Sequence, residues 1–440
     1  MKSKDFLLNE CENLNSVLQQ TLRYEYGLEG SGDFYVECGA RLDHIKAELN
    51  AVAEDNFATL SDLSSMLEAL SALICRIERS SLGEYSWPFV EEFKEITKSI
   101  CTERGGLKQV YPLIHVLSEG GLGAYQIWAE PNRSIGTKRI LTITFPRTLK
   151  HFVLLHPILG HEIGHAIFRY AQYQNALSTI ILDNLVLPSK NFNSEAATVA
   201  WLYDTNAPKG IQLELIVLKN DYGIEAKNFF YNFANFDAWI EEYLCDFIGL
   251  LMFGPSFLAA LCDLLYSIDP TGMGVGEDHP FTGCRVNMLL VAAELMGYDK
   301  LVFDAETQPA VDAFWADLRS KGQSDIWFDL FTKKQISNTL KSLEHFLSSH
   351  AKTLYQIPDV EQIQQFLKQL KEPTPPVGYR FDEKIGSICN EVDFRHILYA
   401  GWIAAADTKA KIPFDTVNRL CEHGIMQQRA IKLMMSEKGV

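Results

Sequence analysis

The sequence lacks any pair of cysteines spaced as a metal knuckle or a redox centre would need. Its nine cysteines are odd in number and widely scattered, and no two of them form a Cys-x-x-Cys pair. A Cys-based zinc knuckle and a thioredoxin-like site are therefore not supported. The N-terminal segment MKSKDFLLNECENLN has too short an apolar run, and too many acids, for a secretory signal. Together these absences favour a reducing, cytoplasmic setting.

Positive charge is also scarce. The chain has 40 Lys and Arg residues against 56 Asp and Glu residues, which gives a formal net charge of −16. Nucleic acids and anionic membrane surfaces bind clustered Lys and Arg side chains, so the acidic balance argues against either as the main partner. The 440 residues, 47% of them hydrophobic and 22% charged, are otherwise typical of a globular protein with two or three domains.

One hydrophobic run must be weighed as a membrane span, at residues 247–268. Gly254 and Pro255 break this run near its middle, and Asp263 would lie inside the hydrocarbon. No Lys or Arg flanks the run at either end. We therefore expect a buried helix–turn–helix here and no membrane span.

Apolar residues in the first part of the chain recur at spacings of three and four. Such a stripe is typical of one or two amphipathic helices. The segment SLGEYSWP at 81–88 interrupts the pattern with Gly and Pro, and FVEEFKEITKSI then restarts it. The pattern predicts a helical N-terminal domain over residues 1–105, without side chains that suggest catalysis. The striped positions are Leu42, Ile45, Leu49, Val52, Leu60, Leu63, Leu67, Leu70, Ile74 and Ile77.

Residues 122–145 change in character and predict a β-hairpin. LGAYQIWAE and RILTITF are rich in β-branched and aromatic residues, and the turn-rich PNRSIGTK separates them. Alternation of apolar residues with Thr142 and Thr144 predicts a half-buried second strand. A helix should follow at about 147–173, with Pro157 opening its second part or kinking it.

Further helices are expected along the rest of the chain. The region 176–300 reads as successive helices, the last of them FTGCRVNMLLVAAEL after a loop at 272–280. PTPPV at 373–377 predicts a short stiff connector. FRHILYAGWIAAA and NRLCEHGIMQQRAIKLMM beyond it predict the last helices. We find no internal repeat and no low-complexity tract.

The motif that carries chemistry is HEIGH at residues 161–165. His161 and His165 are four apart on a predicted helix, so both imidazoles project from one face and can hold one zinc ion. Glu162 lies about a quarter of a turn from His161, close enough to accept a proton from a metal-bound water without ligating the metal. Gly164 should leave room beside the metal.

A catalytic zinc ion takes three protein ligands, so a third must come from elsewhere. A histidine six residues after His165 is absent, because position 171 is Ala. The predicted helix FDAWIEEYLCDFIGLLM offers Glu242 and Asp246, one turn apart on one face. Glu242 could bind zinc while Asp246 accepts the outer N–H of a ligating His. Glu241 competes as a ligand, but it does not share a face with Asp246.

A third element is EDHPFTGCR at 277–285. His279 lies in a Gly-rich loop just before a helix that should open at Pro280. Beside a metal it could stabilise the oxyanion of a tetrahedral intermediate. The alternative is a loop histidine that caps the helix, and sequence alone does not separate the two.

The order of these motifs resembles that of the gluzincins, zinc peptidases with two His ligands and one Glu ligand. HEIGH, then Glu242-Tyr-Leu-Cys-Asp246, then His279-Pro280 with Arg285 six residues after the His, is similar to the prenyl-protease and heat-shock membrane-protease group. The resemblance covers about 140–290, a third of the chain. The chain differs from that group because it lacks clear membrane helices and carries large helical additions at both ends.

The resemblance implies one zinc ion per chain, with His161, His165 and Glu242 as ligands. It further implies Glu162 as the general base, and Asp246 and Arg285 as residues that support the ligands. A protein or peptide substrate follows, with endopeptidase favoured over exopeptidase activity. Two alternatives remain: a catalytically idle helical interaction protein that retains a zinc site, and a membrane-embedded peptidase.

The expected fold is α+β and mostly α-helical. It combines a zincin-like metallopeptidase core and a small antiparallel sheet with helical flanking domains. The expected domains are an N-terminal helical domain over 1–105, the catalytic domain over 106–300 and a C-terminal helical region over 301–440. The sequence leaves the oligomeric state open.

Overall fold

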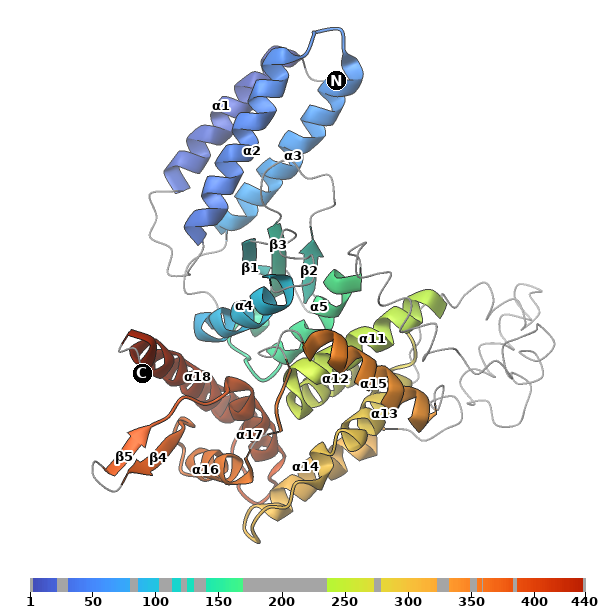
Figure 1. Cartoon of the computed structure of the whole chain (residues 1–440), viewed down its shortest axis with the longest axis vertical. Coiled ribbons are helices and arrows are strands. Elements are labelled where there is room, and N and C mark those ends of the chain that lie inside the picture. Colours follow the sequence, from blue (N-terminus) through green and yellow to red (C-terminus); the bar gives the residue numbers. More distant parts are fainter. Residues whose placement is uncertain are drawn as a thin grey trace, which may run out of the picture. The chain divides into compact units, whose positions relative to one another are not determined.

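A computed structural model describes most of the chain. The described residues are 3–21, 31–79, 86–102, 113–119, 125–129, 140–168, 236–272, 278–322, 332–348, 354–357, 359–382 and 386–437. They fall into two compact units, Met1–His151 and Phe152–Val440. Across these residues the chain is mostly α-helical, as the sequence predicts, and it has two small sheets where one antiparallel sheet was predicted (Figure 1). The domain boundaries predicted after residues 105 and 300 stay predictions.

The first unit begins with three helices that pack side by side (Figure 1). They are α1 (Lys4–Thr21), α2 (Ser31–Ala51) and α3 (Phe57–Arg79). The predicted apolar stripe forms their shared core, since its residues from Leu42 to Leu49 and from Leu60 to Ile74 are buried. Val52 is only partly buried against that core, and the side chain of Ile77 lies outside the described set. Of the one or two helices predicted from the stripe, the structure has two.

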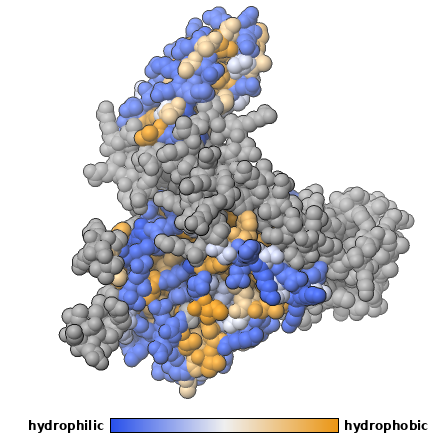
Figure 2. Space-filling model, viewed as in Figure 1, coloured by the Kyte–Doolittle hydropathy of each residue, from blue (hydrophilic) through white to orange (hydrophobic). Residues whose placement is uncertain are grey.

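One of these helices is also apolar enough to be compared with a membrane span. Over Phe57–Cys75, α3 is long and apolar enough to cross a membrane, by length and composition alone. It is the one such helix among the described residues. A third of that window is buried in the structure, at 33%. Figure 2 shows hydrophilic residues interspersed with hydrophobic ones on this face of the α1–α3 bundle, as amphipathic helices present.

A small sheet follows helix α4 (Trp87–Thr102). Its strands are β1 (Leu113–Glu119), β2 (Gln126–Ala129) and β3 (Ile140–Pro146), in the order β1-β3-β2. The antiparallel β2–β3 pair is the predicted hairpin, whereas β1 pairs with β3 in parallel and was not predicted. The sheet is thus mixed. The prediction of a half-buried strand was wrong, because β3 is central and buried at every position, Thr142 and Thr144 included.

The helix predicted at about 147–173 begins later than expected. Two short 3-10 turns come first, η2 (Arg147–Leu149) and η3 (His156–Ile158), and α5 (Leu159–Phe168) follows. Pro157 lies inside η3, where it has no N–H to donate and disfavours helical backbone before it. The end of this predicted helix, and the helices predicted over 176–235, lie outside the described residues.

The apolar run at 247–268 forms the expected helix–turn–helix. Helix α11 (Phe236–Phe253) ends at the break and α12 (Pro255–Ile268) begins directly after it. Gly254 makes the turn with a φ of 59°, which suits a residue without Cβ, and Pro255 occupies the first turn of α12. A Cβ at Gly254 would also collide with the ring of Tyr355.

Helix α17 (Phe394–Ala406) packs against α12 and against α14 (Gln308–Lys321), α16 (Val360–Lys371) and α18 (Phe414–Glu437), and its side chains are almost all buried. Trp402 of α17 donates from Nε1 to the carbonyl oxygen of Leu154 at 3.0 Å, which ties this helix to the segment before α5. The predicted C-terminal helices correspond to α17 and α18. The elements are α13 (Thr282–Leu295), η4 (Tyr298–Lys300), α14 (Gln308–Lys321), α15 (Lys333–Ser348), α16 (Val360–Lys371), the antiparallel pair β4 (Tyr379–Asp382) and β5 (Gly386–Cys389), α17 (Phe394–Ala406) and α18 (Phe414–Glu437).

Candidate metal centre

Helices α5 and α11 pack at unusually close range, and glycines make this possible. A Cβ added at Gly164 would lie 2.7 Å from the Cα of Cys245, and one at Gly160 would lie 3.0 Å from the Cα of Gly249. Carbon atoms in ordinary contact are about 3.5–4.0 Å apart. Gly164 therefore makes room for the backbone of α11. The expectation that it leaves space beside a metal was wrong.

This close packing brings two imidazoles and one carboxylate together. Nε2 of His161 lies 3.0 Å from Nε2 of His165. Of the carboxylate oxygens of Glu242, Oε1 lies 3.1 Å from Nε2 of His165 and Oε2 lies 3.4 Å from Nε2 of His161. The HEIGH helix thus supplies two of the groups and α11 supplies the third, with His161 and Glu242 buried.

The outer nitrogens of both imidazoles also have carboxylate partners. Nδ1 of His161 lies 2.8 Å from Oδ1 of Asp246, and Nδ1 of His165 lies 2.7 Å from Oε1 of Glu241. A carboxylate accepts the Nδ1–H and so fixes the tautomer that leaves Nε2 free to bind a metal. The sequence assigned this role to Asp246 and treated Glu241 as a competing ligand. The distances instead put Glu241 on the outer side of His165.

Arg285 of α13 joins the two buried carboxylates. Its Nη2 and Nε donate to Asp246 at 2.7 and 2.8 Å, and Nη1 lies 3.1 Å from Oε2 of Glu242. The guanidinium is buried, so it neutralises carboxylates that water does not reach. The bidentate contact also orients Asp246 toward His161.

These contacts shift the pKa values of both imidazoles and of Glu242. Burial alone would lower the pKa of His161, but hydrogen bonds with its carboxylate partners raise that pKa to about 10. Burial also opposes the charge on His165, yet Glu241 and Glu242 raise its pKa to about 9. Burial would raise the pKa of Glu242, whereas the charge of Arg285 and both imidazoles hold it well below its ordinary value. The surroundings of both imidazoles therefore stabilise positive charge, whether a proton or a bound cation carries it.

The three groups could hold a metal ion. One ligand atom from each of His161, His165 and Glu242 lies within 4.8 Å of the others. Tetrahedral bonds of 2.0–2.2 Å imply ligand separations of roughly 3.3 Å, close to the distances found here. Oε2 of Glu242 is buried and lies in an ion pair with Arg285 at 3.1 Å, without a hydrogen bond of good geometry, so it can still accept from a cation on its other side.

A second grouping overlaps the first and suits a metal less well. His165, Glu241 and Cys245 also lie close enough to share an ion. Burial raises the pKa of the Cys245 thiol well above its ordinary value, and a neutral thiol is a poor ligand. Glu241 is already the partner of the outer nitrogen of His165. The grouping with Glu242 is therefore the better candidate.

The two remaining predicted residues flank this group. Burial raises the pKa of Glu162, and the charges of His161 and His165 lower it in part, so the carboxyl group lies within their electrostatic reach. His279 comes before α13, its side chain is 65% exposed, and its Nε2 is 3.8 Å from Oε1 of Glu242. Phe281, and not His279, is the N-cap residue of α13, and the side chain of Phe281 forms no cap hydrogen bond.

No protein-family model, curated protein or solved structure matches the chain. The description of this group as a candidate metal centre therefore depends on its distances, its burial and its charges. The residues of the group lie on three separate helices, α5, α11 and α13.

Proposed function

We propose that this chain is a zinc-dependent peptidase, more specifically an endopeptidase, which acts on protein or peptide substrates. The observation that carries the proposal is the convergence of two Nε2 atoms and a buried carboxylate within 3.0–3.4 Å. Two imidazoles and one carboxylate are a ligand set of catalytic zinc sites that keep one position open. The order of motifs, similar to that of gluzincins, supports the same conclusion.

The ligand chemistry favours zinc over other common ions. Magnesium and calcium prefer sites made of oxygen atoms, whereas His161 and His165 contribute nitrogen atoms. The nearby thiol of Cys245 is neutral and offers no thiolate ligand, so a site for a soft metal is disfavoured. When bound, zinc would lower the pKa of a water molecule and polarise a substrate carbonyl.

The side chains around the ligands have separate roles in this proposal. Asp246 and Glu241 hold the two imidazoles in the tautomer that exposes Nε2. Glu162 accepts the proton of the attacking water and passes it to the leaving amine, and its raised pKa brings it closer to that of such a base. His279 is exposed beside Glu242, where its imidazole can donate to the oxyanion that develops on the substrate.

The test uses the full-length protein with an unfolded protein as substrate. Wild type should bind one zinc ion per chain and should lose hydrolysis when a chelator removes the ion. Glu162→Gln keeps the shape but takes no proton, so it should keep zinc and lose at least about a hundredfold in turnover. Glu306→Gln, a change at an exposed carboxylate away from the site, is the matched control and should retain activity.

Metal content then checks the ligand assignment. Glu242→Gln should reduce bound zinc far more than Glu241→Gln, because only the first change removes a ligand oxygen. If the protein binds zinc but wild type and Glu162→Gln are equally inactive on many substrates, the peptidase proposal fails. The alternative of a zinc-containing interaction protein would then hold.

A further inference from the structure

A buried contact between α11 and α13 lies directly beside the metal centre, and the proposed hydrolysis does not use it. The hydroxyl group of Tyr243 and the thiol group of Cys284 are 3.0 Å apart, and either can donate to the other. Both residues are buried, with exposed fractions of 1% and 0%. Burial raises the pKa of Tyr243 well above its ordinary value, so the hydroxyl is protonated and can form a hydrogen bond.

The two partners are sequence neighbours of the charged residues of the site. Tyr243 follows Glu242 on α11, and Cys284 precedes Arg285 on α13. The charges of Arg285 and Asp246 both act on the hydroxyl of Tyr243, so it lies within their electrostatic reach. The contact therefore joins the same two helices, next to the contacts of 2.7–3.1 Å that Arg285 makes with its carboxylates.

The first turn of α13, which carries Arg285, depends on tertiary contacts. The first backbone N–H groups of a helix have no partner within that helix. The side chain of Phe281, the N-cap residue, forms no cap hydrogen bond, and the N–H of Gly283 donates to the carbonyl oxygen of Gly272 at 2.8 Å. Contacts made by side chains of this turn, that of Cys284 among them, therefore contribute to the placement of Arg285.

We propose that Tyr243 is a positioning residue for the metal centre, which acts through Cys284 and Arg285. Its hydrogen bond holds the first turn of α13 against α11, so that the guanidinium group reaches Glu242 and Asp246 together. Both carboxylates are thereby kept oriented toward the imidazoles. The inference rests on the zinc site of the proposed function, but it concerns metal binding and not peptide hydrolysis.

Metal affinity separates a positioning role of Tyr243 from a packing role. A contact that stabilises the metal-free and the metal-bound protein equally leaves the dissociation constant for zinc unchanged, because a ligand responds only to a difference between two states. A contact that orients ligand groups has its full effect in the bound protein, since metal–ligand distances vary by only about 0.2 Å. Loss of the hydrogen bond should therefore appear in zinc affinity as well as in stability.

Zinc titration of the full-length protein against a competing chelator tests the inference. Tyr243→Phe removes only the hydroxyl and should weaken zinc binding about threefold to tenfold, the range of one hydrogen bond. Cys284→Ala should weaken it by a similar factor. The double variant should bind zinc no more weakly than either single variant, because both changes remove the same contact. Cys284→Ser keeps a group that can pair with the hydroxyl, so its zinc affinity should stay within about twofold of wild type.

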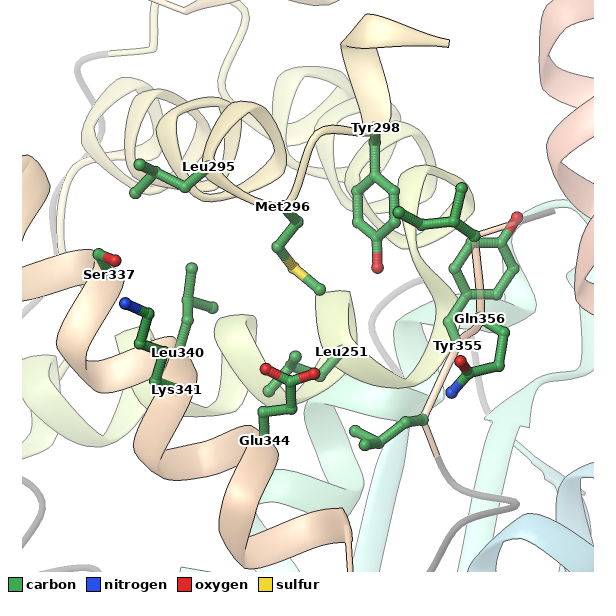
Figure 3. Close-up of a pocket in the computed structure, with 12 residues that line it drawn as sticks. Leu251, Leu295, Met296, Tyr298, Ser337, Leu340, Lys341, Glu344, Tyr355 and Gln356 are labelled. Atoms are coloured by element: carbon green, nitrogen blue, oxygen red, sulfur yellow. The ribbon is translucent and has the colours of Figure 1, made fainter.

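Tyr298 provides a matched control. It is also a buried tyrosine, with an exposed fraction of 1%, and its hydroxyl has no hydrogen-bond partner within the part of the chain that the structure describes. It belongs to η4, beyond the C-terminal end of α13, among the residues around a pocket away from the metal centre (Figure 3). Tyr298→Phe should leave zinc affinity within about twofold of wild type, because it removes no contact of the site.

The outcomes distinguish failure of this inference from failure of the proposed function. If wild type binds zinc and its affinity is equal in Tyr243→Phe and Cys284→Ala, the inference is overturned while the proposed function stands. Equal weakening in Tyr298→Phe and Tyr243→Phe overturns it as well, because the effect would not be specific to the contact. A wild-type protein that binds no zinc overturns the proposed function and the inference with it.

Discussion

Replacing Gly164 with Ala tests whether the close packing of α5 and α11 sets the spacing of the proposed metal ligands. The new Cβ would lie 2.7 Å from the Cα of Cys245 and 2.8 Å from its Sγ. Ordinary carbon contacts need about 3.5–4.0 Å, so the helices must separate by roughly 1 Å. The Nδ1–Oδ1 distance between His161 and Asp246, now 2.8 Å, would then leave hydrogen-bonding range.

The magnitude follows from two opposing effects. Overfilling a packed interface costs about 1–3 kcal/mol, while Ala in place of Gly within a helix returns about 1 kcal/mol. We expect a net loss of up to about 2 kcal/mol in unfolding free energy. Loss of a carboxylate partner to a ligating His weakens metal binding by about 10–100-fold, and we expect the same here.

A matched control is available in the first unit. A Cβ added at Gly39, within α2, would meet Leu18 Cδ2 at 3.6 Å, which is an ordinary contact. Gly39→Ala should therefore stabilise the protein by about 0.5–1 kcal/mol and leave zinc affinity unchanged. Thermal unfolding and zinc titration against a competing chelator measure both variants. Wild-type stability and wild-type zinc affinity in Gly164→Ala would refute the packing argument.

Three further predictions concern the charges of the site. Arg285→Met should destabilise the protein by about 3–5 kcal/mol in denaturant unfolding, since it leaves two buried carboxylates unpaired; a loss below about 1 kcal/mol would contradict this. The metal-free protein should lose stability as pH rises from about 7 to 10, because the pKa values of His161 and His165 lie above the unfolded value of about 6.5. Their contribution to the free energy of unfolding is complete only below that unfolded value. A melting temperature that stays flat or rises over this pH range would argue against protonated imidazoles. His279→Ala should lower kcat about a hundredfold with KM and bound zinc nearly unchanged, whereas loss of zinc would make it a ligand.

Local patterns in the sequence were sufficient to predict several of the helices. The threefold and fourfold spacing from Leu42 onward predicts α2 and α3, and the break at Gly254 and Pro255 predicts the turn between α11 and α12. Both signals act over a few residues, since periodicity and backbone restriction are local properties. The face shared by Glu242 and Asp246 is a local property as well, and the distances place both carboxylates at the imidazoles.

Contacts between distant segments were not predictable in the same way. The parallel pairing of β1 with β3 has no turn to mark it, because parallel strands need a longer connection. The role of Glu241 depends on how α11 lies across α5, which the order of residues along α11 does not specify. The close packing at Gly164 depends on the same geometry. A sequence motif states which groups one helix presents, but not which surface of a second helix meets them.

The carboxylates of α11 also set a charge balance for the buried site. Glu241, Glu242 and Asp246 carry three formal negative charges, and Arg285 neutralises one of them. Two protonated imidazoles would supply the remaining two positive charges, and a divalent ion with neutral imidazoles would supply the same two. Replacing two protons with one such ion therefore leaves the net charge of the site unchanged. Folding of this unit and its later loading with metal can then be separate events, unlike in small zinc domains that fold only around their ion.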